Sequence, residues 1–264
     1  MALLERNPFF QSKLSARRRF PKSFLDKAAS VGGSSYYLNA DGIFTRIYVH
    51  NYFHLLSGGP FEASWIVDLY APSGKRARRF KGRFKGPETV VIDLRHENNI
   101  PAFGVIHTRI ITNEKKEVIG APYTTTFFNE YYRLVPDKGI FAHSLGAPAA
   151  AHYPYERVSL GWMNKENFRP FLLIASGCQY NRIGHNACAD CTVTFVNSKK
   201  ESREIKIGPL KTMACLNLDI FAHDPGMEAH LGREPYHIKF NGKNILSKPY
   251  YYLSDGQRLL GEHT

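Results

Sequence analysis

The sequence predicts an all-β protein built from two tandem antiparallel β-sandwich domains, the outcome that an internal duplication would produce. Short runs of β-branched and aromatic residues recur along the 264-residue chain, and Gly, Pro, Asn or Ser-Gly separate them. No helical pattern of about ten residues lies between these runs. We therefore expect a short basic N-terminal segment over 1–33, a first sandwich over 34–134 and a second sandwich over 135–264.

Helix signals occur in the N-terminal segment, which we expect to be helical in part and extended in part. Ser23 can cap a short helix that Gly32 and Gly33 would end. The segment is rich in arginine and poor in acid, a composition shared by retained basic arms and organelle transit peptides. Pro8 and Pro21 interrupt a continuous amphipathic helix, and the sequence leaves both interpretations open.

The strands of each half follow from the apolar runs and the turn residues that bound them. In the first half we expect strands at 45–53, 62–71, 88–94, 103–112 and 122–128, with "APSGK" over 71–75 as a turn. In the second half we expect strands at 170–176, 191–197, 202–208, 212–220, 236–240 and 248–254. Strands this short and closely spaced are typical of sandwiches and barrels.

Four short blocks recur in one order in both halves, which predicts a tandem duplication. Equivalent positions lie 124 to 130 residues apart and pair Val67 with Val193, Leu94 with Leu218, His107 with His237, and Tyr123 with Tyr250.

The run "VIHTRI" carries a family resemblance through His107, Thr108 and Arg109. A strand that ends in His-Thr-Arg after "VVIDL" resembles the small soluble sensory-rhodopsin transducer proteins. The resemblance implies a β-sandwich in a family concerned with binding and signalling. The second half departs from it with "HIKF".

The stretch "GCQYNRIGHNACADC", residues 177–191, is the candidate metal site. Cys178, His185, Cys188 and Cys191 contain a Cys-x2-Cys pair, whose spacing lets two thiolates meet one tetrahedral zinc ion. A closed Cys3His site would be structural, because it leaves no coordination position for substrate. Ordinary half-buried thiols, or a disulfide or redox pair, are the alternatives. We expect Cys215 to be a core residue.

The net charge of +12 is concentrated in two stretches, residues 1–27 and residues 75–85, and such localised charge favours a localised acidic partner. In the first, Arg17, Arg18 and Arg19 are consecutive. In the second, strand alternation predicts one face that carries Lys75, Arg79, Lys81, Arg83 and Lys85, with Phe80 and Phe84 on the other face beside Arg76 and Arg78. The partner would be an acidic protein surface, an anionic membrane surface or a nucleic acid. The alternative is a charged edge strand that prevents aggregation.

These observations favour a non-enzymatic interaction or assembly protein, and self-association stays open. One alternative is a metalloenzyme that uses the polar group His223, Asp224, Glu228, His230 and His237. Another is a carbohydrate- or small-ligand-binding sandwich that uses the Tyr-rich runs "YHIKF" and "KPYYYL". Signatures such as GxSxG, a Walker loop and HExxH are absent from the sequence.

Two further features bear on location. The first thirty residues lack the uninterrupted apolar core of a secretory signal, and no run of about 18 apolar residues could span a bilayer. We expect a cytoplasmic protein, peripheral to a membrane where lipid is the partner.

Overall fold

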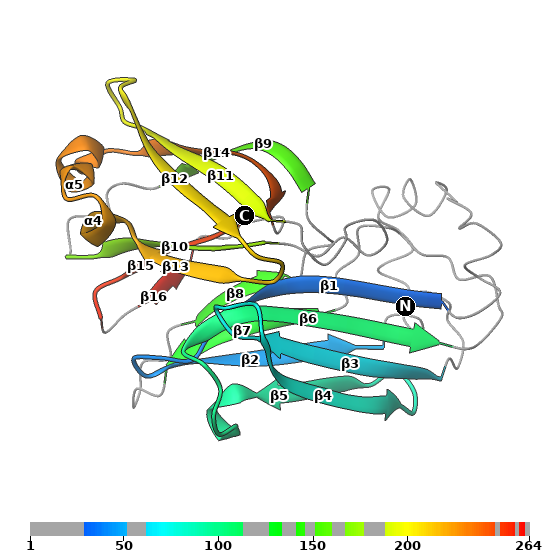
Figure 1. Cartoon of the computed structure of the whole chain (residues 1–264). Helices are drawn as coiled ribbons and strands as arrows, with labels where there is room; N and C mark the ends of the chain where they lie inside the picture. The colour runs from blue at the N-terminus through cyan, green and yellow to red at the C-terminus, as the bar shows by residue number, and fades with distance from the viewer. Residues whose placement is uncertain are drawn as a thin grey trace, which may run out of the picture.

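The computed structural model describes residues 29–51, 62–112, 127–133, 141–145, 151–159, 167–176, 188–245, 249–256 and 259–261. Within these ranges the chain is almost entirely strands arranged in antiparallel sheets (Figure 1), which confirms the predicted all-β class.

The first half forms two four-stranded sheets that pack face to face (Figure 1). Its strands are β1 (Ala29–Leu38), β2 (Ile43–His50), β3 (Ala63–Tyr70), β4 (Arg76–Phe84), β5 (Thr89–Asp93), β6 (Phe103–Thr112), β7 (Phe127–Arg133) and β8 (Phe141–Leu145). One sheet has the order β1-β6-β3-β4 and the other β5-β2-β7-β8. Alternate side chains such as Ile47, Val67 and Ile110 point between the sheets and make the core of this half.

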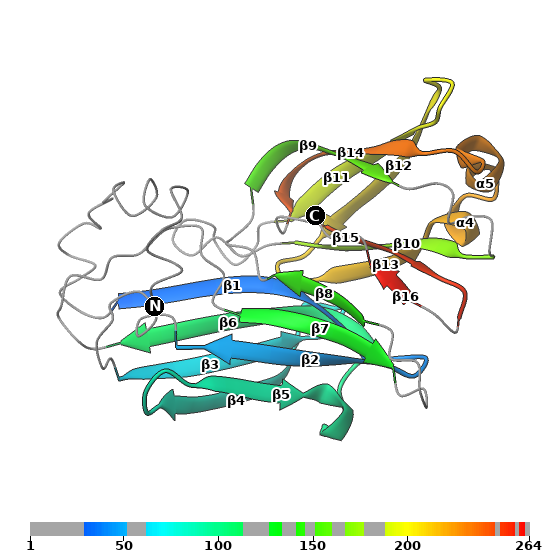
Figure 2. The same cartoon turned by 180° about the vertical axis from the view of Figure 1, so that it is seen from behind.

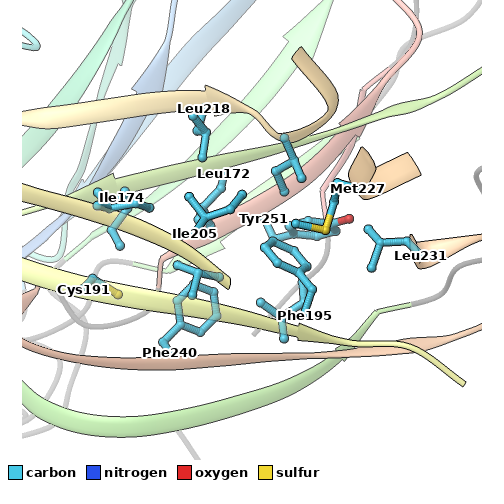
Figure 3. Packing of buried hydrophobic residues seen from close by; sticks show 14 of the residues in the cluster. Leu172, Ile174, Cys191, Phe195, Ile205, Leu218, Met227, Leu231, Phe240 and Tyr251 are labelled. Atoms are coloured by element: carbon cyan, nitrogen blue, oxygen red, sulfur yellow. The ribbon is translucent and has the colours of Figure 1, made fainter. Parts of the chain in front are cut away.

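The second half is also a pair of four-stranded sheets, seen from behind in Figure 2. Its strands are β9 (Ala151–Ser159), β10 (Arg169–Ala175), β11 (Ala189–Val196), β12 (Ser202–Leu210), β13 (Cys215–Asp219), β14 (Tyr236–Ile245), β15 (Tyr250–Ser254) and β16 (Leu259–Gly261). The short helices α4 (Ile220–His223) and α5 (Gly226–Leu231) connect β13 to β14. Phe195, Leu172 and Tyr251 are among the buried residues between its sheets (Figure 3).

The two halves have the same strand order. The second half's sheets run β9-β14-β11-β12 and β13-β10-β15-β16, so each strand occupies the place of the strand eight earlier. A tandem duplication would produce this identity, and the common origin of the halves stays a prediction.

Register corrects one of the proposed equivalences. With Val67 and Val193 matched, Asp68 corresponds to Thr194. Asp68 lies opposite His107 on β6, and Thr194 lies opposite Lys239 on β14, so His107 corresponds to Lys239. The predicted match of His107 with His237 is therefore wrong by two residues, because the sequence blocks were aligned on the histidine rather than on strand pairing.

A third buried cluster joins the two halves. Tyr36, Val105 and Tyr131 of the first half pack with Leu173 and Tyr250 of the second. The interface has its own backbone hydrogen bond, which the amide of Cys215 donates to the carbonyl of Pro72. Cys215 is itself a member of this cluster, as expected for a core residue, and burial raises the pKa of its thiol. The sandwiches are thus packed against one another through aromatic and aliphatic side chains.

The ends of the first sandwich differ from the expected domain limits. Gly32 and Gly33, which the sequence assigned to the end of a helix, lie inside β1 opposite Arg109 and Thr108. Pairing along β6 outweighs the low strand preference of glycine at these positions. The expected boundary between residues 134 and 135 separates β7 from β8, which the structure joins in one sheet.

Candidate functional site

The basic stretch forms β4, which lies at the edge of its sheet among the described strands. The expected turn precedes it: the amide of Ala71 donates to the carbonyl of Lys75, and Gly74 adopts a φ of 83° that L-residues rarely take. Lys75 and Lys85 flank the strand and are exposed. We call β4 with these two lysines the basic edge.

Strand alternation divides the basic edge as the sequence predicted. Phe84 is buried and Phe80 packs against the core of the first sandwich, whereas Lys81 and Arg83 are exposed on the outer face. Gly82 lies opposite Trp65, and a Cβ there would come within 2.6 Å of the indole ring. The glycine therefore lets the indole lie close against the strand.

Arg79 is 38% exposed, but its guanidinium is bound to a buried carboxylate. Its guanidinium donates two hydrogen bonds, of 2.6 and 2.8 Å, to the carboxylate of Asp68, which is only 1% exposed. These hydrogen bonds raise the pKa of Arg79, and Arg109 approaches the same carboxylate at 3.8 Å. Arg78, on the other face, pairs with Glu97 at 3.1 Å. Arg79, which we had placed among the partner-binding residues, thus already has a buried counterion.

Lys81 and Arg83, unlike Arg79, have no counterion among the described residues. For the side chains of Lys75, Lys81, Arg83 and Lys85, the structure records no carboxylate of a described residue within ion-pair distance. These four cations are exposed and available to an external anion.

The equivalent edge of the second sandwich has a different composition. β12 occupies the place of β4, and its sequence "SREIKIGPL" contains two cations, one acid and a proline, against the five cations of "RARRFKGRF" in β4. Its Arg203 pairs with Asp224, and Glu204 bonds to Thr194. Proline also protects an edge, so the two edges are protected by different means, and of the two only β4 concentrates exposed cations.

A buried polar row crosses the outer face of the same sheet beside the basic edge. Ser34, His107, Asp68 and Arg79 are successive cross-strand neighbours. The hydroxyl of Ser34 lies 2.8 Å from Nδ1 of His107. Burial, and then the positive charge of Arg109, lower the pKa of His107 to about 4, although Asp68 opposes the shift. Both oxygens of Asp68 accept hydrogen bonds from Arg79, so the row fixes the position of this guanidinium.

A second polar cluster, which no sequence motif indicated, lies on the outer face of the other sheet. Arg46 pairs with Asp93 at 3.1 Å and with Glu130 at 3.2 Å, and it lies over the ring of Tyr132. Burial raises the pKa of Asp93, but hydrogen bonds from Tyr132, from the Arg95 amide and from Arg46 outweigh it and lower the value. Alternation of polar and apolar residues along β2 was the signal that could have revealed this face. Its charges are satisfied by one another.

Two residues of the proposed zinc site are described. Cys191 points into the core of the second sandwich (Figure 3), where burial raises the pKa of its thiol to about 11, and Cys188 is half-buried. Burial thus disfavours the thiolate form that zinc requires. Cys178 and His185 lie outside the described residues, as do Arg17, Arg18 and Arg19.

Several of the residues behind the two alternative functions are engaged within the protein. Asp224 pairs with Arg203, while Nε2 of His230 lies 3.1 Å from the carbonyl of Phe195. Across the described ranges no three His, Cys, Asp or Glu side chains gather closely enough to hold a metal ion. The four tyrosines of "YHIKF" and "KPYYYL" are buried in the cores rather than exposed to a sugar: Tyr236, Tyr250, Tyr251 and Tyr252.

Comparison with known protein families, curated proteins and solved structures finds no match to this chain. The resemblance to the sensory-rhodopsin transducer sandwiches therefore stays a prediction. None of the helices in the described ranges has the length and apolar character needed to cross a membrane.

Proposed function

We propose that the protein is a non-enzymatic binding protein that holds an acidic protein segment against its basic edge. One observation carries the proposal: Lys81 and Arg83 are exposed without a described counterion on a strand of five cations, whereas the equivalent strand of the second sandwich has two cations, of which Arg203 pairs with Asp224. The ion pair of Arg79 with the buried Asp68 then holds the strand, and Lys81 and Arg83 contact the partner.

The neighbouring side chains favour an acidic protein segment over single-stranded nucleic acid. Proteins that bind single strands combine cations with exposed aromatic side chains on which bases stack. Trp65, Phe80 and Phe84 instead belong to or pack against the core of the first sandwich. An anionic membrane is disfavoured for the same reason, because the aromatic groups beside these cations face inward and are not available for insertion.

The proposal is tested by titrating a fluorescent glutamate-rich peptide and following its anisotropy at several salt concentrations. We expect salt to weaken binding and the double variant Lys81→Glu/Arg83→Glu to weaken it about tenfold, since two cross-strand charge pairs at about 0.2–1 kcal/mol each are lost and reversal adds repulsion of similar size. Lys206→Glu in β12 is the control matched in charge to the single variant Lys81→Glu, and it should leave the affinity unchanged.

Three results would contradict the proposal. Equal losses in Lys206→Glu and Lys81→Glu would mean that overall charge, not the basic edge, binds the peptide. Absence of binding to the wild-type protein would refute an acidic protein partner. Tighter binding of a single-stranded oligonucleotide or of anionic vesicles would assign the basic edge to one of those partners instead.

A further inference from the structure

The basic edge presents a backbone as well as charges. β4 is nine residues long, lies at the edge of the described sheet β1-β6-β3-β4 and contains no proline. A strand at an edge has unpaired amide and carbonyl groups on one side, which form a template for another strand. β12 differs in carrying Pro209, which cannot donate to a ladder. Both edge strands have one register shift against their neighbour, at Leu69 and Tyr70 for β4 and at Ala189 and Cys191 for β12, so the proline is what distinguishes the two edges.

The charges on β4 determine which strand this template accepts. A second copy of β4 would bring the five cations of each strand together, and like charges in cross-strand positions are destabilising. An acidic strand would place carboxylates opposite Lys81 and Arg83. These cations are two residues apart and so lie on one face at the spacing of alternate residues in an added strand. The same cations thus oppose self-pairing and favour an acidic segment.

The residue between these two cations specifies the middle position. Gly82 has no side chain, and the indole of its cross-strand neighbour Trp65 lies against it. An added residue opposite Gly82 would point to the same side as Trp65 and Phe80, which are partly buried and pack against the sandwich core. An apolar side chain fits that position. Arg79 lies two residues before Lys81 on the same face. It requires no acidic residue from the partner segment, because Asp68 already binds its guanidinium.

We infer that the partner segment binds as an extended strand added beside β4, with an acidic–apolar–acidic sequence centred opposite Gly82. The inference rests on the proposed function and adds to it the binding mode and the sequence pattern. Main-chain hydrogen bonds would provide affinity, and the alternate side chains would provide specificity.

The experiment compares three synthetic peptides of equal charge on the wild-type protein. The first contains Glu-Val-Glu within a threonine-rich segment, the second has the same sequence with alternate backbone amides N-methylated, and the third has the two glutamates adjacent. N-methylation on the pairing side removes at least two hydrogen bonds of about 1 kcal/mol each, so we expect it to weaken binding at least about tenfold. The adjacent arrangement moves one glutamate to the opposite face, and we expect a several-fold loss.

Amide hydrogen exchange of the protein gives the second readout. Binding of the first peptide should slow exchange at alternate amides of β4 and leave those of β12 unchanged. If the N-methylated peptide binds as tightly as the first and β4 amides are not protected, strand addition is refuted while an electrostatic binding function stands. If none of the three peptides binds, the proposed function itself fails. The variation lies in the peptide, so no outcome depends on whether a protein variant folds.

Discussion

Replacement of Arg79 by alanine should destabilise the protein more than replacement of its partner Asp68 by asparagine. The reason is the unequal exposure of the two side chains, since that of Asp68 is 1% exposed and that of Arg79 is 38% exposed. Without Arg79, the carboxylate keeps its charge in a position that water barely reaches. Without the carboxylate, the guanidinium regains hydration at the surface.

The exposure and ion-pair distances of these residues set the expected losses in the free energy of unfolding. Removal of one partner of a fully buried pair costs about 3–5 kcal/mol, and the remaining approach of Arg109 at 3.8 Å reduces this, so we expect about 2–3 kcal/mol for Arg79→Ala. Asp68→Asn loses charge-assisted hydrogen bonds on a half-exposed arginine, and we expect about 1–2 kcal/mol. Arg203→Ala breaks an exposed pair in β12 and should cost less than about 1 kcal/mol.

Urea unfolding followed by tyrosine and tryptophan fluorescence would measure the three free energies of unfolding under one buffer condition. The reasoning is refuted if Arg79→Ala is no more destabilising than Arg203→Ala, because that result would mean that water already hydrates Asp68 in the folded protein. Equal values for Arg79→Ala and Asp68→Asn would contradict the argument from unequal exposure.

Four further predictions follow from other features. Gly82→Ala places a Cβ 2.6 Å from the indole of Trp65 and should lower the free energy of unfolding by about 1–3 kcal/mol, which urea unfolding checks against Gly86→Ala, where nothing lies within 4 Å. Leu173→Ala opens the cluster between the halves and should cost about 2–5 kcal/mol; since both halves share that cluster, calorimetry should still show one transition at a lower temperature, and two separated transitions would contradict a shared core. The pKa of His107 is about 4 in the folded protein against an ordinary 6.5, so the unfolded chain binds the proton first and stability should fall by up to about 3 kcal/mol as pH falls from 6.5 to 4; His107→Gln should flatten this slope, and an unchanged slope would show that other groups cause it. The zinc prediction is checked by native mass spectrometry of reduced protein purified without chelator: a mass increase of about one zinc that Cys188→Ser removes would support it, and a metal-free wild type would refute it.

Much of the fold could be predicted from the sequence, because local periodicity carries it. Strands such as β3 and β11 read as alternating β-branched and aromatic runs, and the burial of Phe84 on the inward face of β4 follows from counting by twos. Prediction failed where pairing with a distant strand decides the structure. β1 contains Gly32 and Gly33 and becomes a strand by pairing along β6.

The sequence predicted the row of cations in the candidate site. It did not predict that one of them, Arg79, pairs with a buried carboxylate while Lys81 and Arg83 have no described counterion. The engagement of Arg79 depends on Asp68, which lies across the hairpin and becomes its neighbour only once the register of β3 and β4 is fixed. The burial of Cys191 depends in the same way on the sheet opposite β11, which the spacing of the cysteines does not encode. The cluster between the halves likewise involves residues from several strands that have no shared local pattern.

The difference in charge between β4 and β12 has a consequence for stoichiometry. Two equally receptive edges in one rigid body would make each molecule bivalent, and partners with several acidic segments could then link molecules into a network. In the proposed binding mode β4, with five cations, accepts an acidic strand, whereas β12 has two cations, one acid and a proline, so of these two edges only β4 would bind the segment. The bound segment would then extend one sheet by one strand, and one copy of the protein would bind one segment.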